Sequence, residues 1–277
     1  MNQATASPSK NAPDLAHALR IAKAAARHAS TIAMAHFQQP IEIERKADLS
    51  PVTIADRACE EAIRKIILND FPEHAIYGEE YGRSGEHACL WLIDPIDGTR
   101  SFIRGLEFWS VQIALMVGEE LVLGVSAAPP FDELAWAVRG QGAWLGPLLA
   151  DSDANVEPLQ VDAVDQLDKM DLSLGNVRSL AKDPAAWRTI GQFVEHASRT
   201  RGYGDFYPYH RLAAGRLDAV IESDVNILDI AALTVIVQEA GGMMTQLDGN
   251  RIGLDSSTVL AATPELHSQL KAHMNDR

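Results

Sequence analysis

Apolar residues recur with a helical period in two segments of the N-terminal third of the chain. From Asp14 onward, small and aliphatic side chains lie three or four positions apart, which predicts a long amphipathic helix. Thr53 precedes a second helical pattern, and Asp56 follows three positions later, in the spacing of a capping box. The expected buried face of this second helix consists of Ala55, Ala58, Ala62 and Ile66.

The pattern changes to short apolar or alternating runs in the middle of the chain. Gly, Pro and acidic residues separate these runs, which is typical of neighbouring antiparallel strands. The predicted strands are residues 90–93, 109–117, 121–125 and 134–138.

Residues 151–158 have no apolar pattern and mark the expected boundary between two parts of the chain. Beyond them, strands predicted at 171–174, 217–221, 243–245 and 259–262 alternate with helices predicted at 184–197, 209–214, 229–240 and 264–274. We therefore expect a disordered arm over residues 1–12, an N-terminal half over 13–150 and a C-terminal half over 151–277.

The charge balance limits the possible partners. The 277 residues include 24 Lys and Arg against 38 Asp and Glu, a formal net charge of −14. This excess argues against general binding of nucleic acid polymers or anionic membranes. Two explanations of the acidity remain open: a solvated acidic surface, or a site for cations.

The two cysteines, Cys59 and Cys89, are far apart and have no zinc-ligand spacing around them. They therefore predict neither a disulfide framework nor a zinc site. No run of 18 apolar residues occurs, and the first residues lack the pattern of a signal peptide. We expect a cytoplasmic protein.

The run from Trp91 to Thr99 is the most informative part of the sequence, because an apolar strand there ends in two carboxylates. Asp94 and Asp97 are separated by Pro95 and Ile96. A turn at this point can direct both carboxylates to one spot, which suits cations that prefer oxygen ligands. An ordinary turn stabilised by its own Asp side chains is the alternative.

Three other features add to this picture. Gly98 followed by Thr99 can present backbone N–H groups to an anion, as at other helix starts. Glu79 and Glu80 follow a short apolar run and can supply further oxygen ligands, although the same pattern fits a surface turn. Asp229 begins an apolar helical stretch, where it is either a helix N-cap or another ligand.

These motifs, in this order, resemble the signatures of the inositol monophosphatase family of magnesium-dependent, lithium-sensitive phosphatases. The resemblance runs from about Ile21 to Ala262. It implies a layered α+β fold, an αβαβα sandwich in which N-terminal helices and an antiparallel sheet pack on a C-terminal α/β half, and a homodimer. The matching segments are Gly78-Glu79-Glu80, Asp94-Pro95-Ile96-Asp97-Gly98-Thr99, Asp229-Ile230-Ala231-Ala232 and Glu239-Ala240-Gly241-Gly242.

The resemblance also implies a ligand set for two or three Mg²⁺ ions. Glu79, Asp94 and the backbone carbonyl of Ile96 would hold the first ion. Asp94 would bridge to a second ion, held also by Asp97 and Asp229.

Catalytic roles follow from the same resemblance. Thr99, backed by Asp56, would orient the attacking water, and the N–H groups of Gly98 and Thr99 would bind the phosphate. Glu80 would support the ligands, and Lys46 lies in a loop that is near the site in relatives. The residues show no nucleophile paired with a base, so we expect direct in-line hydrolysis of a small phosphate monoester.

The substrate is predicted from the residues around the leaving group. Residues 46–53, 100–109 and 204–207 resemble the histidinol-phosphatase branch of the family, although Leu228 stands where relatives commonly have Trp or Tyr. We expect Asp205, Phe206, Glu222 and Asp229 to bind the leaving group, with Asp224 a further candidate, because acidic side chains suit the cationic histidinol. A helix cap is the alternative for Asp205.

Other functions remain open at this stage. Inositol 1-phosphate, another sugar phosphate or a nucleotide-derived phosphate would use the same metal site. A non-catalytic regulator that binds a partner through the same fold is the alternative from a different class. Retention of all the acidic positions and of Thr99 favours an enzyme.

Overall fold

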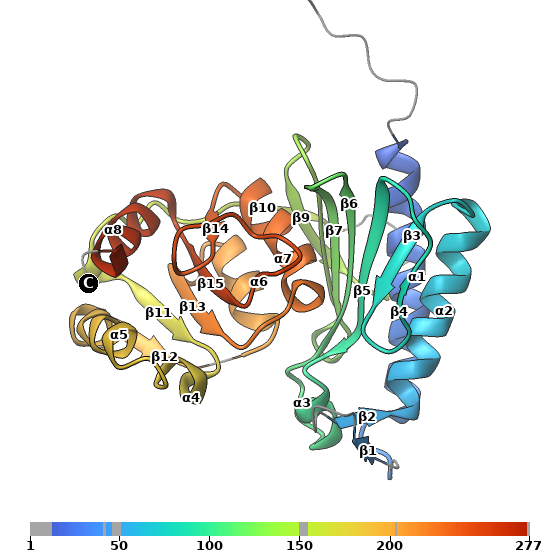
Figure 1. Ribbon diagram of the computed structural model, residues 1–277, viewed down its shortest axis with the longest axis horizontal. Helices are drawn as coiled ribbons and strands as arrows, with labels where there is room; N and C mark the ends of the chain where they lie inside the picture. Colours follow the sequence, from blue (N-terminus) through green and yellow to red (C-terminus); the bar gives the residue numbers. More distant parts are fainter. Residues whose placement is uncertain (1–12, 41–42, 46–50, 150–154, 203, 276–277) are drawn as a thin grey trace, which may run out of the picture.

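The computed structural model of the chain describes residues 13–40, 43–45, 51–149, 155–202 and 204–275. Lys46 and the predicted arm over residues 1–12 lie outside these ranges. Figure 1 shows alternating layers of helices and sheets, with α1 and α2 at one side and α5 and α8 at the other. The αβαβα sandwich expected from the sequence is therefore confirmed.

The first layer consists of α1 (Leu15–His36) and α2 (Ile54–Asp70), which pack side by side on the larger sheet. The Asp14 side chain caps α1 by accepting hydrogen bonds from the N–H groups of Ala16 and His17. Thr53 and Asp56 form the predicted capping box of α2. Between them, β1 (Ile43–Arg45) and β2 (Pro51–Thr53) form a short antiparallel pair.

The second layer is an eight-stranded sheet in the order β10-β9-β8-β7-β6-β5-β3-β4. Neighbours are antiparallel except β3 and β5, which are parallel. The strands are β3 (Ala75–Gly78), β4 (Gly82–Ser84), β5 (Cys89–Asp97), β6 (Ser110–Val117), β7 (Glu120–Ala128), β8 (Glu133–Val138), β9 (Ala143–Pro147) and β10 (Glu157–Leu159). A single 3₁₀ turn, Pro129–Phe131, joins β7 to β8.

The central layer contains α6 (Tyr207–Ala213) and α7 (Ile227–Glu239). Almost every residue of α7 is buried, because it lies between the two sheets (Figure 1). Gly124 of β7 makes this approach possible, since a Cβ there would lie 2.4 Å from the carbonyl oxygen of Ala232. The helix ends before the predicted glycine stop, and Gly241 has φ +89°.

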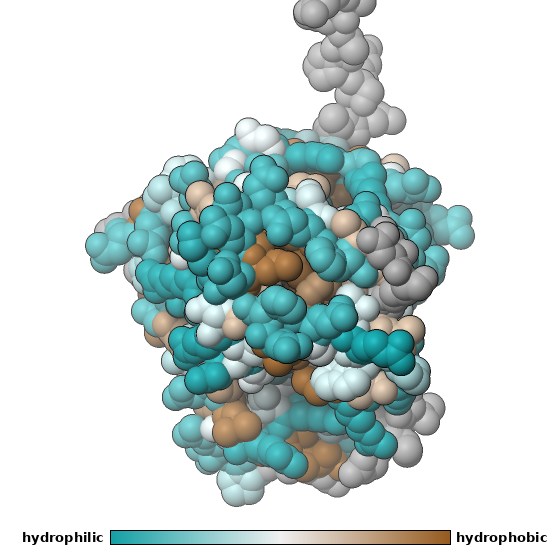
Figure 2. Space-filling model, turned by 90° about the vertical axis from the view of Figure 1, so that its left-hand side faces the viewer, coloured by the Kyte–Doolittle hydropathy of each residue, from teal (hydrophilic) through white to brown (hydrophobic). Residues whose placement is uncertain are grey.

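The smaller sheet has the order β12-β11-β13-β15-β14, and α4 (Val177–Leu180), α5 (Pro184–His196) and α8 (Pro264–Asn275) belong to the same half. Its strands are β11 (Asp171–Leu174), β12 (Arg199–Arg201), β13 (Ala219–Ser223), β14 (Met243–Thr245) and β15 (Thr258–Ala262). The outer face of this half is largely hydrophilic, with separate apolar patches (Figure 2).

The structure differs from the sequence-based expectations at several short elements. β2, β4, β9, β10 and β12 were not predicted, and α6 and α7 each begin two residues before the expected position. The predicted buried face of α2 is wrong except at Ala55: the apolar residues that α2 buries are Ala55, Cys59, Ile63 and Ile67. β10 pairs with β9, so the larger sheet includes residues beyond the proposed boundary at 150, and the division into halves at that point stays a prediction. None of the described helices combines the length and apolar character needed to cross a membrane.

Candidate active site

The carboxylates of Asp94 and Asp97 lie at the irregular end of β5. A turn was expected here, but the strand continues to Asp97, with a shift in its pairing to β6 between the two aspartates. Such a bulge redirects side chains without ending the strand. Asp94 Oδ1 accepts a hydrogen bond from the Ile96 N–H at 3.0 Å, and Asp97 Oδ2 accepts one from Ser110 Oγ at 3.3 Å.

Asp229 reaches the same place from the start of α7. The N-cap is Asn226 rather than Asp229, and Asp229 completes the capping box by accepting the Asn226 N–H at 2.8 Å. One carboxylate oxygen from each of Asp94, Asp97 and Asp229 lies within 4.8 Å of the others. The N-cap alternative for Asp229 is therefore wrong: Asp229 is the N3 residue of the capping box, and its carboxylate also reaches this cluster.

The cluster brings three acidic groups together, two of them buried and one, Asp229, half-buried. Burial raises the pKa of Asp94 and Asp97 well above its usual value, and neighbouring carboxylates, including Glu79 beside Asp94, raise it further. Burial also raises the pKa of Asp229 to about 6. No ion pair between described residues involves these three side chains, and an all-oxygen donor set of this kind fits a hard divalent cation.

The turn after β3, which contains Glu79 and Glu80, places Glu79 beside Asp94, and Glu60 of α2 holds the turn in place. The buried Glu60 carboxylate accepts the Glu80 N–H at 2.6 Å and the Arg64 Nε at 2.7 Å. Gly78 leaves room for this carboxylate, because a Cβ would lie 2.0 Å from Glu60 Oε1. Sequence analysis missed Glu60, although its position one helical turn after Asp56 is a usable signal.

Thr99 and Asp56 are in contact, as the sequence predicted. Thr99 Oγ1 lies 3.3 Å from Asp56 Oδ1 and 3.1 Å from the Ile96 carbonyl oxygen. Asp56 Oδ2 is occupied by the backbone N–H and the hydroxyl of Thr53, which fixes the carboxylate. The hydroxyl has one proton, which it can donate to either of these acceptors, so the lone pairs of its oxygen are available to a water molecule.

Gly98 provides the sharp change of direction between β5 and α3 (Thr99–Ile103). Its φ is +87°, a conformation that favours glycine. A Cβ at this position would also lie 2.7 Å from the Phe108 carbonyl oxygen and 3.1 Å from Asp205 Oδ2. Asp205 therefore lies directly against the backbone that begins α3, where the first N–H groups have no partner within the helix.

A cavity beside the cluster is lined mainly by acidic and polar side chains. Burial raises the pKa of Glu222 to about 8 and that of Asp205 to about 6. The Tyr209 hydroxyl donates to Glu222 Oε2 at 2.8 Å, a contact that sequence analysis missed. The lining residues are Asp97, Asn176, Asp205, Tyr209, Glu222, Val225, Asp229, Ile230 and Leu233.

The structure distinguishes among the predicted leaving-group residues. Asp205 does not cap α6; its carboxylate accepts from Ser101 Oγ at 3.4 Å instead. Phe206 is fully buried, and its ring packs on those of Phe131 and His210, so its side chain does not line the cavity. Asp224 is exposed and lines a different cavity. The Phe206 side chain therefore supports the site from outside the cavity, and the Asp224 side chain lies away from it.

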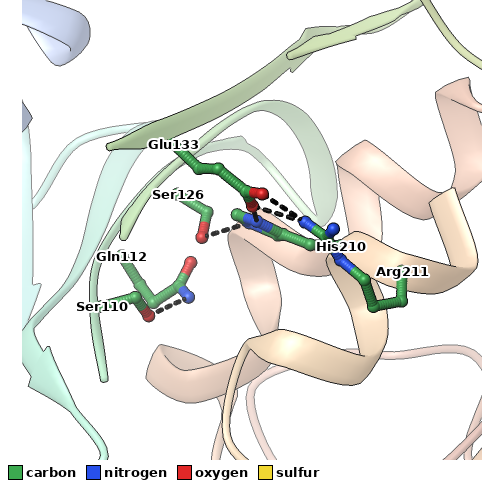
Figure 3. A network of polar contacts seen from close by, with 6 residues as sticks. All are labelled: Ser110, Gln112, Ser126, Glu133, His210 and Arg211. Carbon is green, nitrogen blue, oxygen red and sulfur yellow. Dashed lines mark hydrogen bonds and ion pairs between the residues drawn. The ribbon is translucent and has the colours of Figure 1, made fainter. Parts of the chain in front are cut away.

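A buried polar network anchors α6 to the larger sheet (Figure 3). His210 contacts Ser126 Oγ of β7 at 2.8 Å through Nε2, and Glu133 of β8 at 3.2 Å through Nδ1. Arg211 binds the same Glu133 carboxylate at 2.5 and 2.6 Å. The arrangement resembles a Ser-His-acid triad, but Ser126 and His210 are buried, so it fixes the helix that carries Tyr209 rather than offering a nucleophile.

Comparisons with known proteins give matches over most of the chain. A family model described as the inositol monophosphatase family matches residues 14–277. The histidinol-phosphatase of Streptomyces coelicolor is 34% identical over 276 residues, which cover 96% of this chain and 99% of that protein. The histidinol-phosphatase of Mycobacterium tuberculosis is 36% identical over 236 residues, 85% of this chain and 88% of that protein. The structure of an inositol monophosphatase from Zymomonas mobilis is similar with a TM-score of 0.81 and 30% identity, covering 95% of this chain and 100% of that one.

Proposed function

The chain belongs to the inositol monophosphatase family, and we propose that it is a Mg²⁺-dependent phosphatase that hydrolyses L-histidinol phosphate. The observation that carries the proposal is the convergence of Asp94, Asp97 and Asp229 beside a cavity lined by further carboxylates. The match to the family model confirms the resemblance that the sequence motifs indicated. The named phosphatases among the relatives support hydrolysis of a phosphoric monoester.

The proposed cation ligands all come from the ends of elements that the fold fixes independently. Glu79, Asp94 and the Ile96 carbonyl would hold one ion, and Asp94, Asp97 and Asp229 a second, within a set of two or three. Bound divalent cations supply neutralisation of the phosphate charge, activation of water and stabilisation of the departing oxygen. The buried carboxylates explain why cations are needed, since without them the site repels a phosphate.

We propose that Thr99 orients the water molecule that attacks the phosphate. A water that donates to Thr99 Oγ1 presents a lone pair toward the phosphorus, while the Thr99 proton is held by Asp56 Oδ1. Burial raises the pKa of Asp56, which makes its carboxylate a better proton acceptor. The N–H groups of Gly98 and Thr99 would bind phosphate oxygens, and Glu80 would hold the Glu79 turn through its N–H contact to Glu60.

The leaving group would lie in the acidic cavity against Asp205 and Glu222. Glu222 is buried and Asp205 half-buried, and both carboxylates have raised pKa values, so a cationic group that lies between them lowers the cost of their ionisation. The Tyr209 hydroxyl fixes Glu222 for this contact. An ammonium and an imidazole, as in histidinol, supply such charge, whereas inositol does not.

A direct comparison of substrates tests the proposal. With saturating Mg²⁺, kcat/KM for L-histidinol phosphate should exceed that for myo-inositol 1-phosphate. Glu222→Gln should reduce this preference by at least about tenfold, because it removes one charged contact. Asp224→Asn is the matched control and should leave the preference unchanged, since Asp224 lies outside the cavity.

Each other outcome has a defined meaning. A preference for inositol phosphate would replace the substrate but keep the phosphatase, and hydrolysis of sugar or nucleotide-derived phosphates alone would do the same. Absence of turnover with any monoester would favour the non-catalytic regulator. We also propose a cytoplasmic homodimer inhibited by lithium, to be tested by light scattering, cell fractionation and inhibition assays.

A further inference from the structure

A second cavity, of about 280 Å³, opens between β11, β12 and α6 and shares no lining residue with the acidic cavity. It concentrates positive charge in a chain whose formal net charge is −14. Only one carboxylate, Asp171, is present in its lining. The lining residues are Asp171, Leu172, Arg199, Arg201, Tyr207, Arg211, Arg216 and Leu217.

Two of the four arginines are unpaired. The guanidinium groups of Arg199 and Arg216 make no hydrogen bond or ion pair with another described residue, and both side chains are exposed. Arg201 uses Nη1 to donate to the Thr200 carbonyl at 2.7 Å, which leaves its charge uncompensated. Guanidinium groups gathered around one cavity repel each other, and an anion between them would relieve that repulsion.

Arg211 is the fixed element of the cavity. Its Nη2 binds the Glu133 carboxylate (Figure 3), and its guanidinium lies 5.0 Å from the centre of the Tyr207 ring. Its Nε is buried and has no hydrogen-bond partner among the residues that the structure describes. The paired and stacked guanidinium gives the cavity a rigid, positively charged wall.

We propose that this cavity is a binding site for a small oxyanion, a phosphate or carboxylate group, separate from the acidic site. The planar guanidinium forks of Arg199, Arg201 and Arg216 match such groups in geometry as well as charge. Tyr207 and Arg211 belong to α6, which also carries Tyr209 of the acidic cavity. An anion bound here therefore contacts the helix that supports the proposed leaving-group site.

The test uses the full chain freed of metal with a chelator, because the acidic site then repels anions. Titration with inorganic phosphate, followed by calorimetry and ³¹P NMR, should show one phosphate bound per chain. Arg199→Gln combined with Arg216→Gln should weaken this binding at least tenfold. The matched control replaces Arg178 and Arg188, which are exposed on α4 and α5, and should bind phosphate like the unaltered protein. Succinate in place of phosphate distinguishes a carboxylate ligand from a phosphate ligand.

The active-site variant Asp97→Asn should retain phosphate binding. The proposal for the arginine cavity and the proposal for the acidic site are therefore tested separately. Loss of binding in Asp97→Asn, or equal binding by the unaltered chain and the double Arg variant, would overturn the proposal. The proposal would also be overturned if neither phosphate nor succinate binds at concentrations of about 10 mM. A change of oligomeric state in the double Arg variant without anion binding would assign the cavity to contacts between copies and would also reject it. Circular dichroism of both double variants checks that they are folded.

Discussion

Two clusters of potential metal ligands in this molecule lead to opposite conclusions. Asp94, Asp97 and Asp229 form one, and the stacked side chains of His74 and His87 form the other together with Cys89. Both bring three candidate ligand atoms within 4.8 Å of one another. The difference between them lies in what the lone pairs of those atoms already do.

In the histidine cluster the lone pairs are in use. Trp91 Nε1–H donates to His74 Nδ1 at 3.0 Å, and the Cys89 N–H donates to His87 Nδ1 at 3.0 Å. Both donors can only donate, so each neutral ring carries its proton on Nε2 and has no free lone pair. Burial raises the pKa of the Cys89 thiol, which keeps it protonated rather than a thiolate ligand.

In the aspartate cluster the carboxylates retain acceptor capacity. Asp94 accepts one N–H, and Asp97 accepts one hydroxyl, while each carboxylate has about four lone-pair positions. We infer from this comparison that proximity of ligand-type residues is not sufficient for a metal site. A metal site also needs ligand atoms with unused lone pairs and charge that no neighbouring group compensates.

Asp97→Asn should have the largest effect, lowering Mg²⁺-dependent turnover of the substrate by roughly two orders of magnitude or more, because it removes a proposed cation ligand. The melting temperature without metal should stay the same or rise, since one buried negative charge is lost. His87→Gln is the counterpart in the other cluster and should leave kcat/KM unchanged. Steady-state kinetics and a thermal melt measure both. Equal turnover of Asp97→Asn and the unaltered protein would refute the assignment of the cluster.

Addition of Mg²⁺ should raise the melting temperature of the unaltered protein by several degrees. A ligand at a hundredfold excess over its Kd stabilises the folded state by about 2.7 kcal/mol, and bound cations also relieve repulsion among the carboxylates. Asp94→Asn should remove most of this increase, and His87→Gln should keep it. Zn²⁺ provides the reverse test: a stabilisation that depends on His87 would show that the histidine cluster binds metal after all.

Local features of the fold could be predicted from the sequence. The capping box of Thr53 and Asp56 depends on residues three positions apart, so the sequence alone contains its signal. The apolar strand ending in Asp94 and Asp97 is equally local, although the bulge that replaces the expected turn depends on pairing with β6. The position of Asp229 followed from the family motif, and the structure adds the cap made with Asn226.

Contacts between distant segments could not be predicted in the same way. β10 and β12 have three residues each, too few for a period, and they exist through pairing with β9 and β11. The hydrogen bond from Tyr209 to Glu222 joins a helix to a strand 13 residues away. The catalytic and substrate roles of the site residues stay predictions, because they depend on a bound cation and substrate.

The histidine cluster should show a smaller effect, visible in the pH dependence of stability. Burial, followed by the charge of His87, lowers the pKa of His74 below its usual 6.5. Between the lowered folded value and 6.5 the unfolded chain binds more protons, so the free energy of unfolding falls as the pH drops through this window. His74→Gln keeps an acceptor for Trp91 but does not titrate, and its melting temperature should fall less between pH 7.5 and 5.5 than that of the unaltered protein. His28→Gln, on the exposed side of α1, is the matched control and should retain the full decrease. An identical decrease in all three proteins would show that His74 is not held neutral by the fold, and the contrast between the two clusters would then lose its electrostatic basis.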